Sequence, residues 1–261
     1  MISGHTRVLA VVGDPITAAR APQSLNEALH ARGLDAVAIP AGVPREALAA
    51  FVDGVRGWDN LCGLVVTMPH KPAIARLTDN LTPNSLATGT VNVVRRDADG
   101  TLTGDQIDGE GFIASLTRNG IDTVGSRVLL LGAGGVARSI AFALAAEGPT
   151  RLAIANRSEQ RARDLVLDLR AAFPRVDIGF CEPAAAKDAD IIINATSVGS
   201  AANPGLPLEP HVIPSDAIVA DVVAIPERTA LLHAADARGA RTQSGVLMQE
   251  AQLDHLVDFL L

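Results

Sequence analysis

The sequence predicts an α/β fold in which two successive units each contain a parallel sheet covered by helices. Short apolar runs alternate with helical patterns along the chain, and this alternation is typical of parallel sheets with helices on both faces. The pattern restarts near residue 126 with a buried strand and a glycine-rich loop. A length of 261 residues suits one large domain or two of ordinary size.

The first half of the chain is expected to form strands and helices in turn. Pro22 stands in the first turn of a helix, and Gly33 stops that helix. Residues 97–100 form a turn between two strands. The strands are expected at 7–13, 34–40, 61–67, 90–96 and 101–106, and the helices at 22–32, 46–56 and 109–119.

The second half repeats the alternation with longer apolar runs. Its strands are expected at 126–132, 151–156, 176–180, 190–196 and 217–223, and its helices at 136–146, 159–172 and 245–261. In the last helix Met248, Leu256 and Phe259 share an apolar stripe, on which Gln252 also lies. We expect residues 1–107 to form one domain that the C-terminal helix 245–261 completes, and residues 108–244 to form the other.

Composition excludes several classes of function. The net charge is −7 and the basic residues are scattered, which argues against binding to nucleic acid or to an anionic membrane. Cys62 and Cys181 lie in separate apolar stretches, as reduced thiols of a cytoplasmic protein do. The sequence shows neither a signal peptide nor an apolar run of about 18 residues that could span a membrane. We therefore expect a cytoplasmic location.

Two types of chemistry are also excluded. The chain contains no tyrosine, so a reductase mechanism that uses a tyrosine as the general acid is impossible. Cysteine and histidine are too few and too dispersed for a zinc site. We expect no metal.

A glycine-rich loop points to a dinucleotide. Gly132, Gly134 and Ala137 fit the pattern G-x-G-x-x-G/A directly after an apolar strand and before a helix. The turn needs a missing Cβ, and the helix N-terminus offers N–H groups to a pyrophosphate. A tight turn without a ligand is the alternative. The pattern predicts a Rossmann-type domain.

The end of the next strand indicates which dinucleotide binds. NAD-binding domains usually have an acidic residue there that accepts a hydrogen bond from the ribose. This chain has Asn156, Arg157 and Ser158 instead, followed by Arg161. Two arginines suit a 2′-phosphate, although Glu159 lies between them and offsets part of their charge. The alternative is an ordinary solvated helix start. We expect NADP in preference to NAD.

One lysine is conspicuous because nearly every cation of the chain is arginine. There are only two lysines, Lys71 and Lys187. Arginine stays protonated at any ordinary pH, whereas the pKa of a buried lysine falls readily, so that a lysine can give and take a proton. Taken alone, Lys71 is interpreted as a surface cation.

The order of short motifs resembles that of the shikimate dehydrogenase family over essentially the whole chain. The motifs are GDPI, TMPHK, GTVNVV, GDQIDG, GAGGVAR, NRSEQR, NATSVG, DVVAIPERTALL and GVLMQEAQ. The resemblance implies an N-terminal α/β substrate domain plus a Rossmann-type NADP-binding domain, with a C-terminal helix that returns to the first. It also implies reversible hydride transfer between NADP(H) and a ring ketone or alcohol, a small-molecule substrate, a place in aromatic amino acid biosynthesis, and a monomer or homodimer.

The resemblance implies roles for particular residues of the first domain. Lys71 matches the catalytic lysine and Asp108 its aspartate partner, although Asp108 alone reads as a helix N-cap. Asn92, Gln252 and Thr67 match positions that contact the substrate. The alternatives are that Asn92 bonds backbone in a turn and that Gln252 faces solvent.

The resemblance also implies a set of cofactor contacts, which lie in the second domain and at the start of the C-terminal helix. They are Gly132, Ala133, Gly134, Gly135, Val136, Ala137, Asn156, Arg157, Ser158, Arg161, Asn194, Ala195, Thr196, Val222, Gly245 and Met248.

The chain departs from the family where polar groups are expected to bind the substrate carboxylate. Ala19 and Ala21 stand at the places of a Ser-x-Ser pair, and Val65 replaces an asparagine. Ala224 replaces a tyrosine that faces the substrate. A buried carboxylate without donors is costly, so the sequence predicts weak binding of shikimate.

Three further positions belong to this question. Gln106 and Ile107 replace an Asn-Thr pair before the aspartate. His70 stands where the family commonly has an aromatic residue, and His70 or Arg20 is a candidate to bind the carboxylate. The alternatives are a histidine that fills space and a solvated arginine.

Three functions remain open on the sequence. The first is an active NADP-dependent oxidoreductase with an altered pocket. The second is a non-catalytic sensor that binds NADP(H) and a ligand; retention of Lys71, Asp108 and Asn92 favours the enzyme, because a sensor needs no proton donor. The third, a reductase of another α/β family, leaves the order of motifs unexplained.

Overall fold

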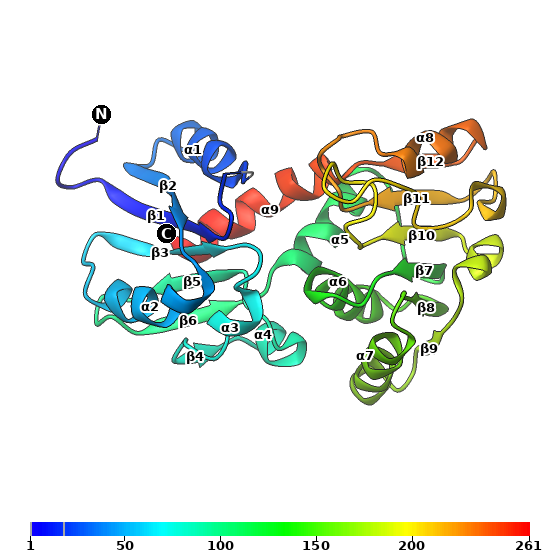
Figure 1. Cartoon of the computed structure of the whole chain (residues 1–261), viewed down its shortest axis with the longest axis horizontal. Coiled ribbons are helices and arrows are strands. Elements are labelled where there is room, and N and C mark those ends of the chain that lie inside the picture. The colour runs from blue at the N-terminus through cyan, green and yellow to red at the C-terminus, as the bar shows by residue number, and fades with distance from the viewer. Residues whose placement is uncertain (1, 18) are drawn as a thin grey trace. The chain divides into compact units, whose positions relative to one another are not determined.

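The computed structural model describes residues 2–17 and 19–261, and the chain divides into two compact units (Figure 1). The first unit contains the residues up to Ile107 together with Gln252–Leu261, and the second contains Asp108–Ala251. The chain therefore passes from one unit to the other twice, the second time within its last helix, α9 (Gly245–Leu260).

The first unit is built on a six-stranded sheet with the order β2-β1-β3-β5-β6-β4. Besides the end of α9, its elements are β1 (Arg7–Gly13), α1 (Ala21–Ala31), β2 (Ala36–Gly42), η1 (Arg45–Ala47), α2 (Leu48–Arg56), β3 (Leu61–Val66), α3 (Lys71–Ile74), β4 (Asn80–Leu81), α4 (Pro83–Thr88), β5 (Val93–Arg96) and β6 (Leu102–Asp105).

The first sheet is mixed, whereas the alternation of strands and helices indicated a parallel sheet. β1, β2 and β3 are parallel, but β5 runs antiparallel to both β3 and β6. The turn expected at 97–100 is confirmed and accounts for the β5–β6 pair: there the N–H of Asp97 donates to the carbonyl of Thr101 at 2.9 Å. Two neighbouring strands joined by so short a turn can only be antiparallel.

The two faces of the first sheet are covered by different helices. Leu9 and Val11 of β1 lie in an apolar cluster with residues of α1 and α9, whereas Ala10 and Val12 lie in a second cluster with residues of α2 and α3. This alternation follows from the two-residue period of a strand. Figure 1 shows α1 and α2 on opposite faces of the sheet.

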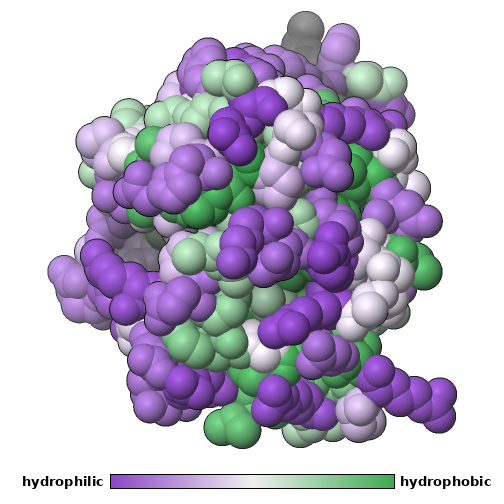
Figure 2. Space-filling view, turned by 90° about the vertical axis from the view of Figure 1, so that its right-hand side faces the viewer, coloured by the Kyte–Doolittle hydropathy of each residue, from purple (hydrophilic) through white to green (hydrophobic). Residues whose placement is uncertain are grey.

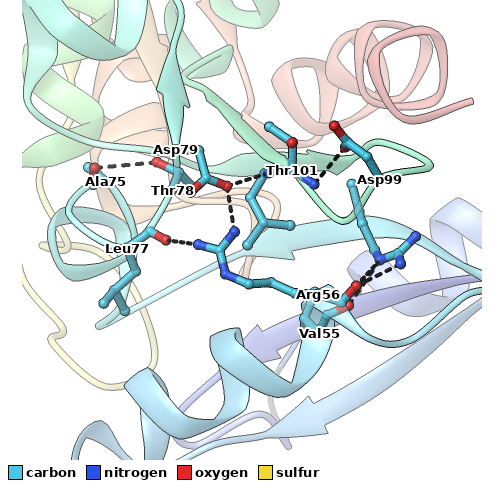
Figure 3. Close-up of polar contacts among 10 residues, drawn as sticks. Val55, Arg56, Ala75, Leu77, Thr78, Asp79, Asp99 and Thr101 are labelled. Atoms are coloured by element: carbon cyan, nitrogen blue, oxygen red, sulfur yellow. Dashed lines mark hydrogen bonds and ion pairs between the residues drawn. The ribbon is translucent and has the colours of Figure 1, made fainter.

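Polar contacts fasten the segment that follows α3 to the end of α2 (Figure 3). Arg56 forms an ion pair with Asp79 and donates to the carbonyl of Leu77 at 3.1 Å. The carboxylate of Asp79 also accepts from the N–H of Leu102 at 2.8 Å. Because Arg56 and then Leu102 hydrogen-bond to the ionised form, the pKa of Asp79 lies below its usual range.

The second unit is built on a six-stranded sheet with the order β12-β11-β10-β7-β8-β9, and all its strands are parallel. Its elements before α9 are α5 (Asp108–Arg118), β7 (Arg127–Leu131), α6 (Gly135–Glu147), β8 (Arg151–Ala155), α7 (Glu159–Ala172), β9 (Asp177–Phe180), η2 (Pro183–Asp188), β10 (Ile191–Asn194), η3 (Pro210–Val212), β11 (Ile218–Asp221), α8 (Ala230–Ala237) and β12 (Arg241–Gln243).

Helices cover both faces of the second sheet. Val128 and Leu130 of β7 pack in a cluster with α5, α6 and α7, whereas Leu129 and Leu131 pack on the other face with α8. On the face seen in Figure 2, hydrophilic side chains are spread widely, with small apolar patches between them. Among the described residues, no helix is both long enough and apolar enough to cross a membrane.

The apolar stripe of α9 serves two cores rather than one. Met248 is buried in the core of the second unit, whereas Leu256 is buried in the core of the first, with Phe259 packed against it. The residues 245–251, which the sequence assigned to the first domain with the rest of the helix, lie in the second unit.

Candidate functional site

One edge of the first sheet collects most of the candidate residues of the first unit. β1 and β3 are parallel, so their carboxyl ends, Gly13 and Val66, lie at the same edge. β5 is antiparallel to β3, and its first residue therefore lies at this edge, as does the last residue of its antiparallel partner β6. The segments after β1, after β3, before β5 and after β6 meet there.

Thr67 and Lys71 are held at this edge by backbone hydrogen bonds. The N–H of Thr67 donates to the carbonyl of Val12 at 2.9 Å, and a Cβ added at Gly13 would lie 2.5 Å from Thr67 Cγ2. Lys71 is half-buried at the start of α3, and its carbonyl accepts from the N–H of Val91 at 3.0 Å. The loop from 67 to 71 is thereby tied to the residues on both sides of it in the sheet.

Asn92 is buried between these segments. Its backbone joins β3 to β6, because its carbonyl accepts from Val66 at 2.7 Å and its N–H donates to Asp105 at 2.9 Å. Its side-chain Oδ1 accepts from the N–H of Ile107 at 2.9 Å. The side-chain oxygen of Asn92 therefore bonds backbone, as the alternative interpretation of this residue predicted.

His70 lies inside the first unit. The residue is 1% exposed, and Nε2 lies 2.7 Å from the carbonyl oxygen of Val43, just after β2. Nε2 is thus engaged with backbone, and the ring ties the Lys71 loop to the end of β2. This contact supports the space-filling interpretation of His70 more than direct binding to a carboxylate.

Four of the residues that replace expected polar groups gather in one apolar cluster of the first unit, whereas Ala224 is buried in the second unit. Val65 and Ile107 are buried members of the cluster beneath α1 and α9, and Ala19 and Ala21 pack against it. Gln106 is buried, and its Nε2 donates to Thr90 Oγ1 at 2.8 Å. The side chains of Ala19, Ala21, Val65 and Ile107 supply no hydrogen-bond donor, whereas the amide of Gln106 is already engaged with Thr90.

Other candidates of the first unit are less enclosed. Gln252 is half-buried in α9, so it does not simply face solvent. Arg20 is exposed at the N-cap of α1.

In the second unit, the glycine loop lies at the carboxyl end of β7, between β10 and β8. Gly132 has φ +120°, and a Cβ there would lie 2.9 Å from the carbonyl oxygen of Ala195. Only glycine fits this position, since both the backbone and the space exclude a side chain. Gly134 caps α6, and the space beside its Cα is open. Open space before a helix N-terminus suits a pyrophosphate.

The remaining residues of the loop continue into the helix. Gly135 is the first residue of α6, and Ala137 is fully buried against the sheet. Ala133 and Val136 are partly buried against the same core.

The loop after β8 presents two exposed arginines. Arg157 and Arg161 are exposed, and Asn156 Nδ2 donates to the carbonyl of Ser158, the N-cap of α7, at 2.9 Å. Glu159 accepts from Arg163 Nε at 2.7 Å. That ion pair engages the carboxylate expected to offset the two arginines.

A buried polar network shapes the loop after β10. Asn194 Nδ2 donates to Asp221 Oδ1 at 2.9 Å and to the carbonyl of Val198 at 3.0 Å, while its Oδ1 accepts from Thr196 Oγ1 at 2.7 Å. Thr229 Oγ1 donates to Asp221 Oδ2 at 2.7 Å. Asp221 therefore links β11 to the loop that carries Ala195 and Thr196.

Burial raises the pKa of Asp221 above its ordinary value. Hydrogen bonds from the N–H of Val223, from Thr229 and from Asn194 favour the ionised form and oppose this rise. Asp221 and Thr229 were not predicted as site-shaping residues. The available signal for Asp221 was an acidic residue within the apolar run 217–223.

The start of α9 lies against the loop after β11. A Cβ at Gly245 would lie 2.5 Å from the carbonyl oxygen of Val222, so no larger residue fits. The N–H of Val222 donates to Asn194 at 2.9 Å, and Met248 is buried one turn along α9. These three candidate residues are therefore grouped beside the Asn194 loop.

Asp108 begins the second unit, whereas Lys71 belongs to the first. Asp108 is 4% exposed at the first residue of α5, where the helix dipole favours a carboxylate. The next N–H, of Gly109, donates to Ser139 Oγ of α6 at 2.8 Å. The N-terminus of α5 is thus fixed on α6.

The described residues contain no group of three side chains suited to hold a metal ion. Cys62 and Cys181 are free and half-buried, and burial raises the pKa of both thiols.

Comparison with known proteins gives matches along the chain. A family model described as the shikimate dehydrogenase substrate binding domain matches residues 11–94, and one described as shikimate/quinate 5-dehydrogenase matches residues 115–203. A shikimate dehydrogenase (NADP(+)) of Geobacter metallireducens is 39% identical over an alignment of 260 positions that covers 96% of this chain and 90% of that protein.

Solved structures agree with these matches. The shikimate 5-dehydrogenase of Thermus thermophilus, in complex with NADP(H) and shikimate, has a TM-score of 0.90 and 29% identity over 98% of this chain and 93% of that chain. The ligand-free 5-ketofructose reductase of a Gluconobacter species has a TM-score of 0.89 and 29% identity over 99% of this chain and 94% of that chain.

Proposed function

The chain belongs to the shikimate dehydrogenase family, and from that premise we propose that it is an NADP-dependent oxidoreductase acting on the CH–OH group of a cyclic polyol. In the direction of reduction, the ketone carbon gains a hydride and its oxygen gains a proton. One ketone, one NADPH and one proton thus become one alcohol and one NADP⁺.

One observation carries this proposal. The candidate residues of each unit gather at a single edge of its sheet, around Thr67, Lys71 and Asn92 in the first and around Gly132 and Asn194 in the second. In parallel α/β sheets, ligands bind at the carboxyl edge where the strand order reverses. β7 lies at that point of the second sheet, between β10 and β8.

The second unit fits NADP. NADP(H), when bound, takes or supplies the hydride. Gly132 and Gly134 leave room for a pyrophosphate at the N-terminus of α6, and Arg157 and Arg161 suit a 2′-phosphate through charge-assisted hydrogen bonds. The loop that Asp221 and Asn194 hold, with Val222, Gly245 and Met248 beside it, is proposed to line the nicotinamide end.

Lys71 is proposed to hold and move the proton at the substrate oxygen. As an ammonium it stabilises the oxyanion that develops during reduction and then protonates it. Asp108 is proposed as the carboxylate partner of this lysine, as the family resemblance implies. Thr67, Asn92 and Gln252 are proposed to bind the hydroxyl groups of the substrate.

The family name makes shikimate and 3-dehydroshikimate the first candidate substrates, with a role in aromatic amino acid biosynthesis. The methyl groups of Ala19, Ala21 and Val65 favour a pocket in which shikimate binds weakly. The likeness to 5-ketofructose reductase adds a second candidate, a ketose without a carboxylate. A non-catalytic sensor is disfavoured, because the half-buried Lys71 is set in a loop braced on both sides.

The enzyme is proposed to act in the cytoplasm. It is expected to act as a monomer or homodimer on a small molecule, without a nucleic-acid or membrane partner.

A screen of NADP⁺ reduction over cyclic polyols with and without a carboxylate tests the proposal. Lys71→Ala is expected to lose about 10²–10⁴ in kcat on any active substrate, while NADPH binding survives. Lys187→Ala is the matched control, because Lys187 is the other lysine of the chain and is exposed. Turnover that survives in Lys71→Ala would exclude the proton-transfer role, and absence of any turnover in the wild type would favour the sensor.

A further inference from the structure

The segment after β1 presents an apolar surface at the edge of the first sheet. Ile16, Ala19 and Ala21 are half-buried in it, and all three pack against the cluster that contains Val65 and Ile107. Its polar residues Asp14, Thr17 and Arg20 are exposed. The half-buried positions that the structure describes in residues 14–21 are therefore all apolar.

This apolar surface adjoins the polar candidate residues. A Cβ added at Gly13 would lie 2.5 Å from Thr67 Cγ2 and 3.3 Å from Ile16 Cδ1, so Thr67 and Ile16 are neighbours. Ile107 is joined to Asn92 by the bond from its N–H to Oδ1 at 2.9 Å. A molecule that reaches Thr67 thus meets side-chain carbons of Ile16 next to it, above the buried side chains of the cluster.

The side chains of this surface do not stabilise a carboxylate. An ionised group that leaves water needs charge-assisted hydrogen bonds or a cation in place of its hydration. Alanine, valine and isoleucine side chains supply none, and the backbone N–H of Ala19 already donates to the carbonyl of Ile16 at 3.0 Å. An uncharged, partly apolar group loses far less hydration free energy than a carboxylate does when it contacts the same carbons.

We propose that the substrate of this chain is an uncharged polyhydroxy ketone or alcohol, whose part remote from the reacting carbon lies against Ile16, Ala19 and Ala21. The inference rests on the oxidoreductase function proposed above. It limits the proposed substrates to uncharged compounds. Lys71 and Asn92 remain assigned to the end of the substrate that carries the reacting carbon.

The test compares shikimate with methyl shikimate, which has the same ring hydroxyls and no charge. With NADP⁺ and the full-length protein, kcat/KM for the ester is expected to exceed that for shikimate by about tenfold or more, the cost of one missing charged hydrogen bond. Reduction of 5-ketofructose with NADPH is expected to exceed that of 3-dehydroshikimate in the same way. Equal or higher kcat/KM for the two carboxylates would overturn the inference.

Binding separates a failure of this inference from a failure of the proposed function. The wild type loaded with NADPH cannot oxidise an alcohol, so calorimetry with shikimate and with its methyl ester measures the preference without turnover. Tighter binding of the ester supports the substrate class even in a protein that shows no catalysis. Equal or tighter binding of shikimate, or binding of neither compound, overturns it.

Arg20 is the nearest alternative source of positive charge in this segment. In Arg20→Ala the ratio of the two kcat/KM values is expected to stay as in the wild type, because the exposed guanidinium does not contact the substrate. A further loss of shikimate activity in Arg20→Ala, with the ester unaffected, would show that Arg20 binds a carboxylate and that the inference is wrong.

Discussion

The side-chain Oδ1 of Asn92 accepts a hydrogen bond from the backbone N–H of Ile107 at 2.9 Å. This contact joins the residue before β5 to the residues after β6, where the first unit ends. One buried amide therefore fixes both the edge of the sheet that is proposed to bind substrate and the point at which the chain leaves that unit.

Asn92→Ala is expected to lower the free energy of unfolding by about 1–3 kcal/mol, because the buried N–H of Ile107 loses its acceptor. Urea denaturation measures this loss. Asn60→Ala is the control, because exposed Asn60 also bonds a backbone group of the first unit, the carbonyl of Thr6 at 3.1 Å, and is expected to cost less. Equal losses in the two variants would show that burial of the Asn92 bond adds nothing.

Lys71→Arg is expected to fail to restore the turnover that Lys71→Ala loses. Arginine keeps the positive charge but does not release a proton at working pH. Steady-state kcat of the arginine and alanine variants on the best substrate measures the effect, with Lys187→Arg as control. Full activity in Lys71→Arg would mean that charge alone suffices at this position.

Arg157→Ala is expected to weaken NADPH binding by about 1.5–3 kcal/mol, the size of a hydrogen bond to a charged group, and to leave NADH nearly unchanged. Titration of the fluorescence of the reduced nicotinamide follows both cofactors. Arg175→Ala, at another exposed arginine of the second unit, is the control. Equal losses for NADPH and NADH would place Arg157 away from the 2′-phosphate.

The double variant Ala19→Ser with Ala21→Ser is expected to lower the KM for shikimate and to leave the KM for methyl shikimate nearly unchanged. The new hydroxyls supply donors to a carboxylate at about 1.5–3 kcal/mol for each bond to a charged group. Steady-state kinetics on both compounds, beside the wild type, measures the change. A sub-millimolar KM for shikimate in the wild type would show that another group already binds the carboxylate.

The buried Asp221 is expected to make stability depend on pH. Because burial raises its pKa in the folded protein, its contribution to stability is fully present below the unfolded pKa and is lost as pH rises through the folded pKa. The unfolding free energy of the wild type minus that of Asp221→Asn should therefore fall as pH rises through this window and then level off. A constant difference would contradict the raised pKa.

Asp79→Asn is a control for which the pH dependence of stability is expected to have the opposite sign. The pKa of Asp79 is lowered by Arg56, so its contribution is present above the unfolded pKa and is lost as pH falls through the folded pKa. The corresponding difference in unfolding free energy should fall as pH is lowered.

The sequence predicts long elements well because each carries its own signal. Helix α7 begins and ends at Glu159 and Ala172 as expected, since its apolar positions recur with helical spacing between clear boundaries. The short helices α3 and α4 and the two-residue strand β4 were missed. β4 is defined only by its pairing with β6, and no local pattern announces such a contact.

Helix α8 was missed although the sequence carried a signal for it. Thr229 caps the helix by accepting from the N–H of Leu232 at 3.3 Å, and a threonine before an apolar run is a usual helix start. The Asp221 network could not be predicted in the same way, because it depends on β10 lying beside β11, which the order of the strands along the chain does not state.

The division of α9 between two cores also constrains the order of events on the ribosome. Leu256, Val257 and Leu260 fill the same cluster as Leu9 and Val11, yet they are translated only after all of Asp108–Ala251. The first unit is begun first and cannot close its core until the second unit has been made. The strands that are synthesised early therefore keep part of an apolar face exposed until α9 is made. During that interval the nascent chain can bind chaperones or aggregate.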